Sequence, residues 1–422
     1  MLEIAALGCS GRYILRNLDW RRLRAVTVAL PVALATATPE ARAVELSLEQ
    51  AMEYAAQHAP QVRIAESTLL EAKASRAGAG VVLPANPRLF AEGRAASGAA
   101  GFLASLEAPF ELFGAPGARV AEADGRAGAA QAELDLERYL VRYLAYELYV
   151  ELRMTTLRLA ESQLAIEIAT RVVEASQRLV ETGASSEIDL AVATASLAEF
   201  RAGREALLAR EQETVLPLRE LLGLAPGTPV VLTTALDAPA SCVVETSTEG
   251  GHPALRAIQA QLALGQRSLD RLEREVNPRL SFLVAVDKAP NSDTYGALGV
   301  GVELPFAQRN EGPRAVTTAQ LATDQTRLDL TLQRLGRELE ARRAACEARK
   351  READLLGGVA LPQARKALQL VEAGWRAGKF DVFRVNTAAR DVIRLGQQRI
   401  DVLDLGWKEH IAIQRLSAGG AP

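Results

Sequence analysis

The sequence has too few cysteines and histidines for a cysteine-based or metal-based fold. Three cysteines occur in 422 residues, Cys9, Cys242 and Cys346, with no Cys-x-x-Cys pair and no histidine at ligand spacing. An odd and scattered set of this kind argues against a disulfide framework or a zinc site. The histidines are equally scattered, and we expect ordinary surface or packing roles for all three, His58, His252 and His410.

Aromatic residues and net charge are also scarce. Aromatics make up 5% of the chain although 49% of its residues are hydrophobic, and much of the apolar count is alanine. Alanine favours helices and close approach between helices rather than bulky cores, so we expect an elongated helical body. The net charge of −3 predicts binding neither to nucleic acid nor to anionic lipid.

The residue patterns of catalysis are missing as well. The sequence contains no recognisable nucleophile–base set, metal-ligand cluster or phosphate-binding loop. The glycines of GALGVG (296–301) fall inside an expected strand rather than at a strand-to-helix turn, so they do not form a nucleotide loop. We therefore expect a protein that is not an enzyme and that uses no cofactor and no metal site.

The N-terminus has the features of a secretory signal peptide. Three arginines within residues 21–24 precede the apolar run AVTVALPVALATA (25–37), and Ala-Arg-Ala at 41–43 supplies a cleavage site. We assign residues 1–43 to an upstream extension and a signal peptide, with the mature chain beginning near Val44. A buried N-terminal helix is the alternative.

Two other forms of membrane attachment are not expected. Cys9 follows a Leu-Gly pair, as in a lipobox, but the basic and apolar segments that should precede it are missing. No other stretch approaches the roughly 20 apolar residues of a transmembrane helix. The mature chain is therefore expected to be exported without a helical anchor.

The second half of the sequence repeats landmarks of the first half. The tetrapeptide NPRL occurs at 86–89 and again at 277–280, and LVETGASSEIDL (179–190) is echoed by LVEAGWRAGKFDVF (370–383). A spacing of about 190 residues is too long for a solenoid repeat, whose units run roughly 20–50 residues. We expect one unit, made of a helix, two short strands, a long helix and a returning helix, to occur twice.

Two pairs of short segments alternate with period two and predict β-hairpins at about 87–110 and about 279–305. Their turns are AASGAAG (95–101) and APNSD (289–293), which are built from residues that favour turns. Strands of roughly 10 residues with one apolar face fit either a half-buried soluble sheet or an outer-membrane barrel.

Alternation alone favours the soluble sheet, whereas the signal peptide, the repeat and the aromatic residues near the strand ends favour the barrel. Open sheet edges do not survive in lipid, so four strands require oligomerisation, and three chains would supply about 12 strands. Ser281 and Gly301 are expected on the lumen side. The residues expected on the lipid-facing side are Leu106, Phe282, Val284, Val300 and Val302.

A very long helical stretch follows each hairpin. Residues 118–181 predict an uninterrupted helix of roughly 96 Å at about 1.5 Å per residue. In the matching stretch, 314–374, Gly357, Gly358 and Pro362 should kink or interrupt the helix. A returning helix and a leading helix, placed end to end, can lie beside each long helix. These shorter helices are expected at 47–80, 187–222, 252–276 and 381–417.

The fold class is therefore mainly α with a small β part, in four segments. Residues 1–43 precede a first repeat at 44–222, a linker at 223–250 and a second repeat at 251–422. The linker contains one candidate strand near 229–234. Residues 235–250 lack periodicity, so they should lie outside the wall formed by the helices and tolerate insertions.

Several segments resemble the TolC-like outer-membrane efflux protein family over about residues 45–417, and their order, spacing and repetition carry the resemblance. The pattern is most similar to the heavy-metal (cobalt–zinc–cadmium) efflux branch. The segments are LSLEQAMEYAAQHAPQV (46–62), NPRL before each hairpin, LRELLGLAPGT (218–228), LPFAQRNEGPRA (304–315) and WRAGKFDVFRVNTA (375–388).

The resemblance implies a homotrimer in the outer membrane of a Gram-negative bacterium. A 12-stranded β-barrel, with four strands from each chain, would continue into a periplasmic α-helical barrel. The implied partners are outer-membrane lipid, a periplasmic adaptor protein and an inner-membrane (RND-type) pump that supplies the energy. The chain would be a passive, gated conduit that exports small molecules or metal cations, and its cargo is not readable from the sequence.

The resemblance also places a gate at the tips of the two helical hairpins. In the first tip Gly183 is the turn glycine and Asp189 follows where the family often has an acid. In the second tip Trp375 takes the position usually given to tyrosine, and Gly378 is the turn glycine. Drug-exporting members often carry acids after that glycine, but Arg384 stands at a matching position here, which argues against an acidic ring.

The two tips carry opposite charges, acidic in the first repeat and basic in the second. If the hairpins of a trimer converge, these patches could meet and hold the entrance closed. A solvated position at a helix end is the alternative for each residue. The acidic set is Glu181, Glu187 and Asp189, and the basic set is Arg376, Lys379 and Arg384.

The alternative function is a periplasmic coiled-coil structural protein or adaptor of an export assembly, which would also contain helical hairpins. Adaptors usually add lipoyl-like and β-barrel domains with long all-β stretches, and this sequence has none. The channel is therefore the preferred interpretation.

Overall fold

The computed structural model describes residues 44–96, 98–243, 251–306 and 309–417. The expected signal peptide and the lipobox-like Cys9 lie outside these residues. The described chain is mainly helical, with one four-stranded sheet and one two-stranded sheet. The order of its elements in the first half recurs in the second half, with an interruption in the second long helix. Its origin by duplication stays a prediction.

The first leading helix is broken where the sequence predicted one helix over 47–80. Helix α1 (Leu48–His58) begins at a capping box formed by Ser47 and Gln50, and α2 (Pro60–Ala74) follows after a single residue. Proline lacks the amide hydrogen that a continuing helix needs and disfavours helical geometry in the residue before it. Accordingly, Ala59 is extended, with ψ of 143°.

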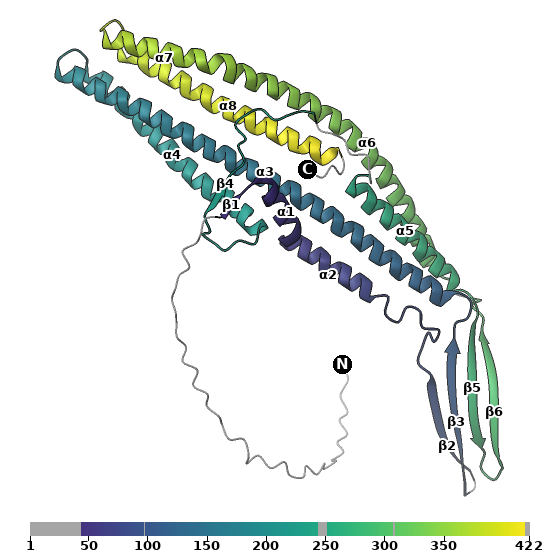
Figure 1. Cartoon of the computed structure of the whole chain (residues 1–422). Helices are drawn as coiled ribbons and strands as arrows, with labels where there is room; N and C mark the ends of the chain where they lie inside the picture. The colour runs from purple at the N-terminus through teal and green to yellow at the C-terminus, as the bar shows by residue number, and fades with distance from the viewer. Residues whose placement is uncertain (1–43, 97, 244–250, 307–308, 418–422) are drawn as a thin grey trace, which may run out of the picture. The chain divides into compact units, whose positions relative to one another are not determined.

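The two expected hairpins form a single antiparallel sheet. Its strands are β2 (Arg88–Ala96), β3 (Ala99–Phe110), β5 (Arg279–Lys288) and β6 (Thr294–Glu303), in the order β2-β3-β5-β6. The hairpins meet at β3 and β5, where Leu106 lies opposite Val284. The four strands lie side by side in Figure 1, with β2 and β6 at the edges.

The long helices differ as the glycines and the proline predicted. Helix α3 (Ala115–Glu181) runs for 67 residues without interruption. Its counterpart is divided into α6 (Glu311–Leu355), a π-helical turn η1 (Leu356–Ala360) and α7 (Leu361–Arg376). The turn contains Gly357 and Gly358, and Pro362 follows it directly in the first turn of α7, as expected where a proline and a π-helical turn disturb a long helix.

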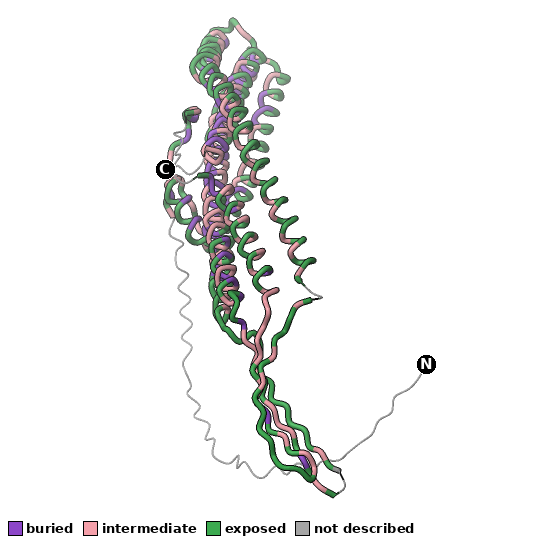
Figure 2. The backbone as a smooth tube through the Cα atoms, turned by 90° about the vertical axis from the view of Figure 1, so that its right-hand side faces the viewer, coloured by how far each residue is buried: buried purple, intermediate pink, exposed green. Residues whose placement is uncertain are grey.

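The remaining helices surround α3 and α6. Helices α1, α2, α4 (Glu187–Leu221), α5 (Pro253–Arg274) and α8 (Val382–Leu416) all contact α3, whereas α6 contacts α5 and α8. The turns between α3 and α4 and between α7 and α8 lie at the end away from the sheet (Figure 1). Buried residues follow the central helices, and the strands are largely exposed (Figure 2).

A second, two-stranded sheet lies at the middle of α3, and the sequence predicted only half of it. Strand β4 (Val230–Leu232) is the candidate strand of the linker, and its parallel partner β1 (Val44–Leu46) was not expected. The fully buried Tyr149 of α3 joins β1 to the segment that follows β4. Its hydroxyl donates to the carbonyl of Leu46 at 3.1 Å and accepts from the amide of Thr234 at 2.9 Å.

The expectation that the cysteines form no disulfide is wrong for one pair. Cys242, in the linker, is bonded to Cys346 of α6, with their Cα atoms 5.7 Å apart. The two residues are 104 positions apart in the chain. Sequence spacing gave no sign of the pairing because only the packing of the linker on the helices brings these residues together.

The linker is held along α8 as well as by the disulfide. The indole of Trp407 donates to the carbonyls of Leu236 and Ala238, each at 3.2 Å, and Arg399 donates to the carbonyl of Asp237 at 2.9 Å. These contacts argue against free insertion in the part of the linker that precedes Cys242. Tolerance at 244–250 concerns residues outside the described part of the chain.

Candidate functional site

The five residues expected to face lipid lie on one face of the sheet. The register pairs Leu106 with Val284, Phe282 with Val300, and Leu280 with Val302, and paired residues share a face. All five are exposed, from 46% for Leu106 to 65% for Val300. Phe110 adds an edge-on ring 5.2 Å from that of Phe282. One face of the sheet is therefore a continuous apolar surface that the described part of the chain leaves uncovered.

The opposite face of the sheet is polar and contains Ser281, which the register pairs with Gly301. A Cβ atom added at Gly301 would lie 2.5 Å from the Ser281 hydroxyl oxygen, so the glycine allows close approach of β5 and β6. Towards the hairpin turns, Arg94 lies 3.6 Å from Asp287. The amphipathic character that the alternation predicted is therefore present in the folded sheet.

A buried carboxylate that the sequence did not single out fixes the sheet to the helices. Glu111 follows β3 directly, and its side chain is 3% exposed. It forms an ion pair with Arg119 of α3 and lies 3.0 Å from Arg279 of β5. Arg119 also donates to the carbonyls of Ala79 and Val81. A buried acid is stable only when paired, so this cluster holds four segments at one junction.

The first helical tip is ordered by local hydrogen bonds. Gly183 has φ of 74°, a left-handed conformation that ends α3. Asp189 completes a capping box with Ser186 at the start of α4 and accepts from the Ser185 hydroxyl at 2.8 Å. Hydrogen bonds from Ser185 and then Ser186 lower the pKa of the Asp189 carboxyl. Glu187, in the first turn of α4, and Glu181, the last residue of α3, are exposed.

The second helical tip uses a similar turn with different side chains. Gly378 has φ of 70°, and Asp381 caps α8 by accepting from the amide of Arg384 at 3.0 Å. The Arg384 guanidinium lies 5.2 Å from the centre of the Phe380 ring. Trp375 is buried against the surrounding apolar side chains, and its place in a gate stays a prediction.

The charges of the two tips do not meet within one chain. Arg376 lies 3.6 Å from Glu372 on its own helix, Lys379 is exposed, and Asp189 is engaged at its own cap. No ion pair in the described part of the chain joins the acidic tip to the basic tip. Contact between α4 and α8 occurs farther from the tips, where Arg390 lies 3.3 Å from Glu199.

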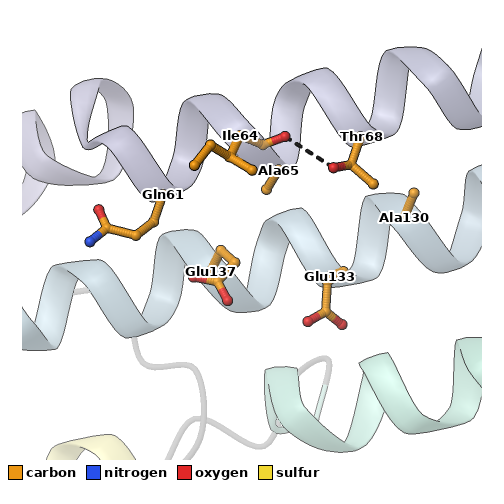
Figure 3. Close-up of a pocket in the computed structure, with 7 residues that line it drawn as sticks. All are labelled: Gln61, Ile64, Ala65, Thr68, Ala130, Glu133 and Glu137. Atoms are coloured by element: carbon orange, nitrogen blue, oxygen red, sulfur yellow. Dashed lines mark hydrogen bonds between the residues drawn. The ribbon is translucent and has the colours of Figure 1, made fainter.

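A groove of about 310 Å³ lies between α2 and α3. Ile64, Ala65 and Thr68 of α2 face Ala130 of α3 across it, and Glu133 points away from α2 (Figure 3). Ile64 is 67% exposed. The groove is thus a mostly apolar surface between two helices, and Gln61 and Glu137 complete its lining.

The described residues contain neither a cluster of metal ligands nor a membrane-spanning helix. No group of three or more histidine, cysteine or acidic side chains is placed to hold a metal ion within residues 44–417, apart from the gaps given above. Across the same part of the chain, no helix has both the length and the apolar character needed to cross a membrane.

The arrangement of the helices and the sheet matches solved outer-membrane proteins. The Campylobacter jejuni CmeC outer membrane channel superposes with a TM-score of 0.72 at 13% identity, covering 88% of this chain and 86% of that one. The chain therefore has the fold of an outer-membrane channel, as the resemblance to TolC-like efflux proteins implied.

Two curated relatives point to a particular branch. The cobalt-zinc-cadmium resistance protein CzcC of Cupriavidus metallidurans is 25% identical over 335 residues, which cover 74% of this chain and 76% of the relative. The nickel-cobalt-cadmium resistance protein NccC of Alcaligenes xylosoxydans xylosoxydans is 26% identical over 53% of this chain and 52% of the relative. No family model matches. The matches confirm the resemblance to the TolC-like family and the expected outer-membrane location.

Proposed function

We propose that this chain is the outer-membrane channel subunit of a tripartite efflux system. Three copies would form a passive conduit, with the four-stranded sheets closing a barrel and the helices continuing it into the periplasm. Transport would be driven by an inner-membrane (RND-type) pump, through a periplasmic adaptor. In this role the chain performs no catalysis.

The observation that carries the proposal is the sheet. It exposes a continuous apolar face on one side and has two open edges, β2 and β6. In water such a surface would favour aggregation. In a bilayer the apolar face would be solvated by lipid, but the edges must then be paired with strands from other copies. A membrane-embedded oligomer satisfies both requirements.

The fractionation of the protein tests this function. Outer membranes are extracted with mild detergent and the chain is run on a gel with and without heating. We expect a trimer in the unheated outer-membrane sample and a monomer after heating. A soluble monomer in the periplasmic fraction would instead support the alternative of a periplasmic coiled-coil or adaptor protein.

We infer the cargo class from the curated relatives, whose names refer to resistance to cobalt, zinc, nickel and cadmium. Export of divalent metal cations is therefore the first hypothesis. Cells that lack the chain should lose tolerance to zinc, cobalt or cadmium salts and regain it on complementation. Loss of tolerance only to organic drugs would assign the channel to another cargo.

The gate belongs to the same proposal. Pairing of the acidic tip of one copy with the basic tip of another would hold the entrance closed. Exposed ion pairs are each worth only about 0–1 kcal/mol, but threefold symmetry repeats each contact in every copy. Such pairs can bias a two-state gate without locking it.

The double substitution Asp189→Asn with Arg384→Ala tests the gate. In planar bilayers it should conduct more than the unaltered protein, and high salt should narrow the difference by screening the pairs. The matched control is Asp391→Asn with Arg394→Ala, which removes an exposed pair at 3.1 Å from the body of α8. Equal conductance of the tip variant and the control in intact trimers would place the gate elsewhere.

A further inference from the structure

The end of the sheet next to the helices carries four charges whose signs alternate along the strand order. Arg88 of β2 lies opposite Glu107 of β3, and Arg279 of β5 lies opposite Glu303 of β6. All four side chains line one concavity of about 510 Å³ on the polar face. Read across β2, β3, β5 and β6, the signs are plus, minus, plus and minus, and between the two hairpins the register pairs Glu107 with Leu283, four residues from Arg279.

The outer two of these charges lie on the two open edges of the sheet. Arg88 and Glu303 are exposed, and neither forms an ion pair within the part of the chain that the structure describes. The inner charge Arg279 is already engaged by buried Glu111 at 3.0 Å. At the other end of β2, Arg94 is engaged within the chain by Glu92 and Asp287.

The strand directions determine how a second copy can pair with these edges. All neighbouring strands in the sheet are antiparallel, so β2 and β6 run in opposite directions. Pairing β6 of one copy with β2 of the next continues the antiparallel order. It also keeps the apolar faces on one side and the helices at one end. If Glu303 then lies near Arg88 of the next copy, the alternation of signs continues across the junction.

We propose that Glu303 of one copy and Arg88 of the next form an ion pair that fixes the register of β6 against β2 between copies. The partner is a second copy of this chain, so the inference rests on the proposed function. Opposite charges on neighbouring strands favour pairing and like charges oppose it. Register must be specified because a slip of one residue would exchange the lipid and lumen faces.

The pair also determines the charge at the junction between barrel and helices. With Glu111 and its partner Arg119 included, each copy contributes three arginines and three glutamates at this junction, so a closed ring of copies carries no net charge there. This level of the channel would therefore select neither cations nor anions by charge.

Cross-linking measures whether the two edges meet. The variant Arg88→Cys with Glu303→Cys, in a Cys9→Ser background, is treated in isolated outer membranes with a short bismaleimide. Within one chain, three inter-strand spacings of about 4.8 Å separate the two edges by at least roughly 14 Å. A cross-linker shorter than that joins only different copies. We expect covalent dimers and trimers on denaturing gels.

The matched control for cross-linking is Arg94→Cys with Glu303→Cys. Arg94 lies on the same strand and face as Arg88, but six residues, or roughly 20 Å, farther along. It should yield monomer. Equal cross-linking of the two variants, or none with Arg88→Cys and Glu303→Cys, would overturn the proposed register.

Charge reversal measures whether the pair stabilises the assembly. Arg88→Glu and Glu303→Arg should each lower the temperature at which the trimer dissociates in detergent. The double reversal should recover more than half of the summed loss. The like-charge contacts that the single variants create with Glu107 and Arg279 are far apart within one chain and should simply add. Recovery therefore reports contact between copies.

The outcomes separate this inference from the proposed function. Unaltered protein that is never trimeric would overturn both. Trimeric protein with additive single variants would overturn only the ion pair and leave the channel assignment standing. Cross-linking together with recovery in the double reversal is the result that supports the proposal.

Discussion

The two long helices occupy corresponding places in the chain and are buried to very different extents. Helix α3 has 21 buried residues, including Tyr143, Tyr146 and Tyr149. Helix α6 has two, Cys346 and Ala353. The cause is the number of neighbours, because five helices contact α3 whereas α5 and α8 cover α6. Several large apolar side chains of α6 are exposed, among them Leu330 and Leu332.

This difference means that the long helix of the first half forms the interior of the helical body, whereas the long helix of the second half forms part of its surface. Helix α3 is stabilised by burial within its own chain. Helix α6 packs mainly against α5 and α8, so its other side is exposed. The apolar side chains on that exposed side are suited to contact with another copy of the chain. In the proposed trimer, neighbouring copies would cover such surfaces.

Truncation of one large side chain on each helix should give the largest difference in unfolding free energy between α3 and α6. Tyr149→Ala removes a fully buried ring and should lower the free energy of unfolding by about 3–5 kcal/mol. Leu332→Ala, at a half-exposed position of α6, should cost less than about 1 kcal/mol in the detergent-solubilised monomer. Denaturant unfolding followed by circular dichroism measures both values.

Tyr149→Phe refines the same comparison by removing only the hydroxyl. The amide of Thr234 and the carbonyl of Leu46 would lose their partner, at a cost of about 1–3 kcal/mol. Tyr295→Phe, at an exposed position of β6, is the control and should have no measurable effect. Equal effects at the two tyrosines would contradict the central role given to α3.

Removal of the disulfide tests how much the linker stabilises α6 at Cys346, one of the two buried residues of this helix. Cys346→Ser releases the linker from α6, and we expect a loss of about 2–4 kcal/mol in unfolding free energy. The unaltered protein should show a similar loss when reduced, and the variant should not respond to reductant. A variant that still responds to reductant would mean that another cysteine pairing stabilises the fold.

Charges introduced on the two faces of the sheet test whether its exposed apolar surface meets lipid. Val300→Lys should lower membrane assembly by about 2–4 kcal/mol if the residue lies at mid-bilayer. Ser281→Lys, on the polar face, should be tolerated better. Gly301 is a poorer control, because a side chain there would also force the Ser281 hydroxyl to move. Equal loss of trimer for the two lysine variants would contradict the barrel.

The smallest expected effect is a loss of folding stability at acidic pH, caused by protonation of the buried His252 and His410. Burial lowers the pKa of His252 and of His410. The unfolded chain then binds protons more readily than the folded chain, so stability is complete above about pH 6.5 and falls as the pH drops below it. His252 must also stay neutral at Nδ1, which accepts from the amide of Ala254 at 3.1 Å.

Melting temperatures measured between pH 7.5 and pH 5 check this effect. His252→Asn retains a cap acceptor and removes the titration, so its melting temperature should vary less with pH. The control is His58→Asn, at an exposed position, which should leave the variation of melting temperature with pH unchanged. A pH dependence that survives in a variant lacking both His252 and His410 would assign it to carboxylates instead.

Local signals predicted most of the secondary structure. Long runs of helix-forming residues predicted α3, α4 and α8, although α4 contains Pro217, and the glycine pair with Pro362 predicted the interruption after α6. Alternation with period two predicted both hairpins and the apolar face, since side chains on a strand must alternate between its sides. The break at Pro60 also has a local signal, because proline disfavours helical geometry in the residue before it.

The sequence predicted the surroundings of the candidate site residues less completely. Gly183 and Gly378 were identified as turn residues because a left-handed conformation favours glycine. Trp375 proved to be buried, and Asp189 and Arg384 have local partners that a linear pattern does not reveal. Their proposed role in a gate remains a prediction.

By itself, the sequence determined where helices and strands form and which face of each strand is apolar, because these properties depend on neighbours within a few residues. Only the tertiary structure decided the Cys242–Cys346 bond, the pairing of β1 with β4, and the burial of Glu111 between Arg119 and Arg279. Each of these joins residues far apart in the chain. Their partners are chosen when the helices pack, and no local pattern encodes that choice.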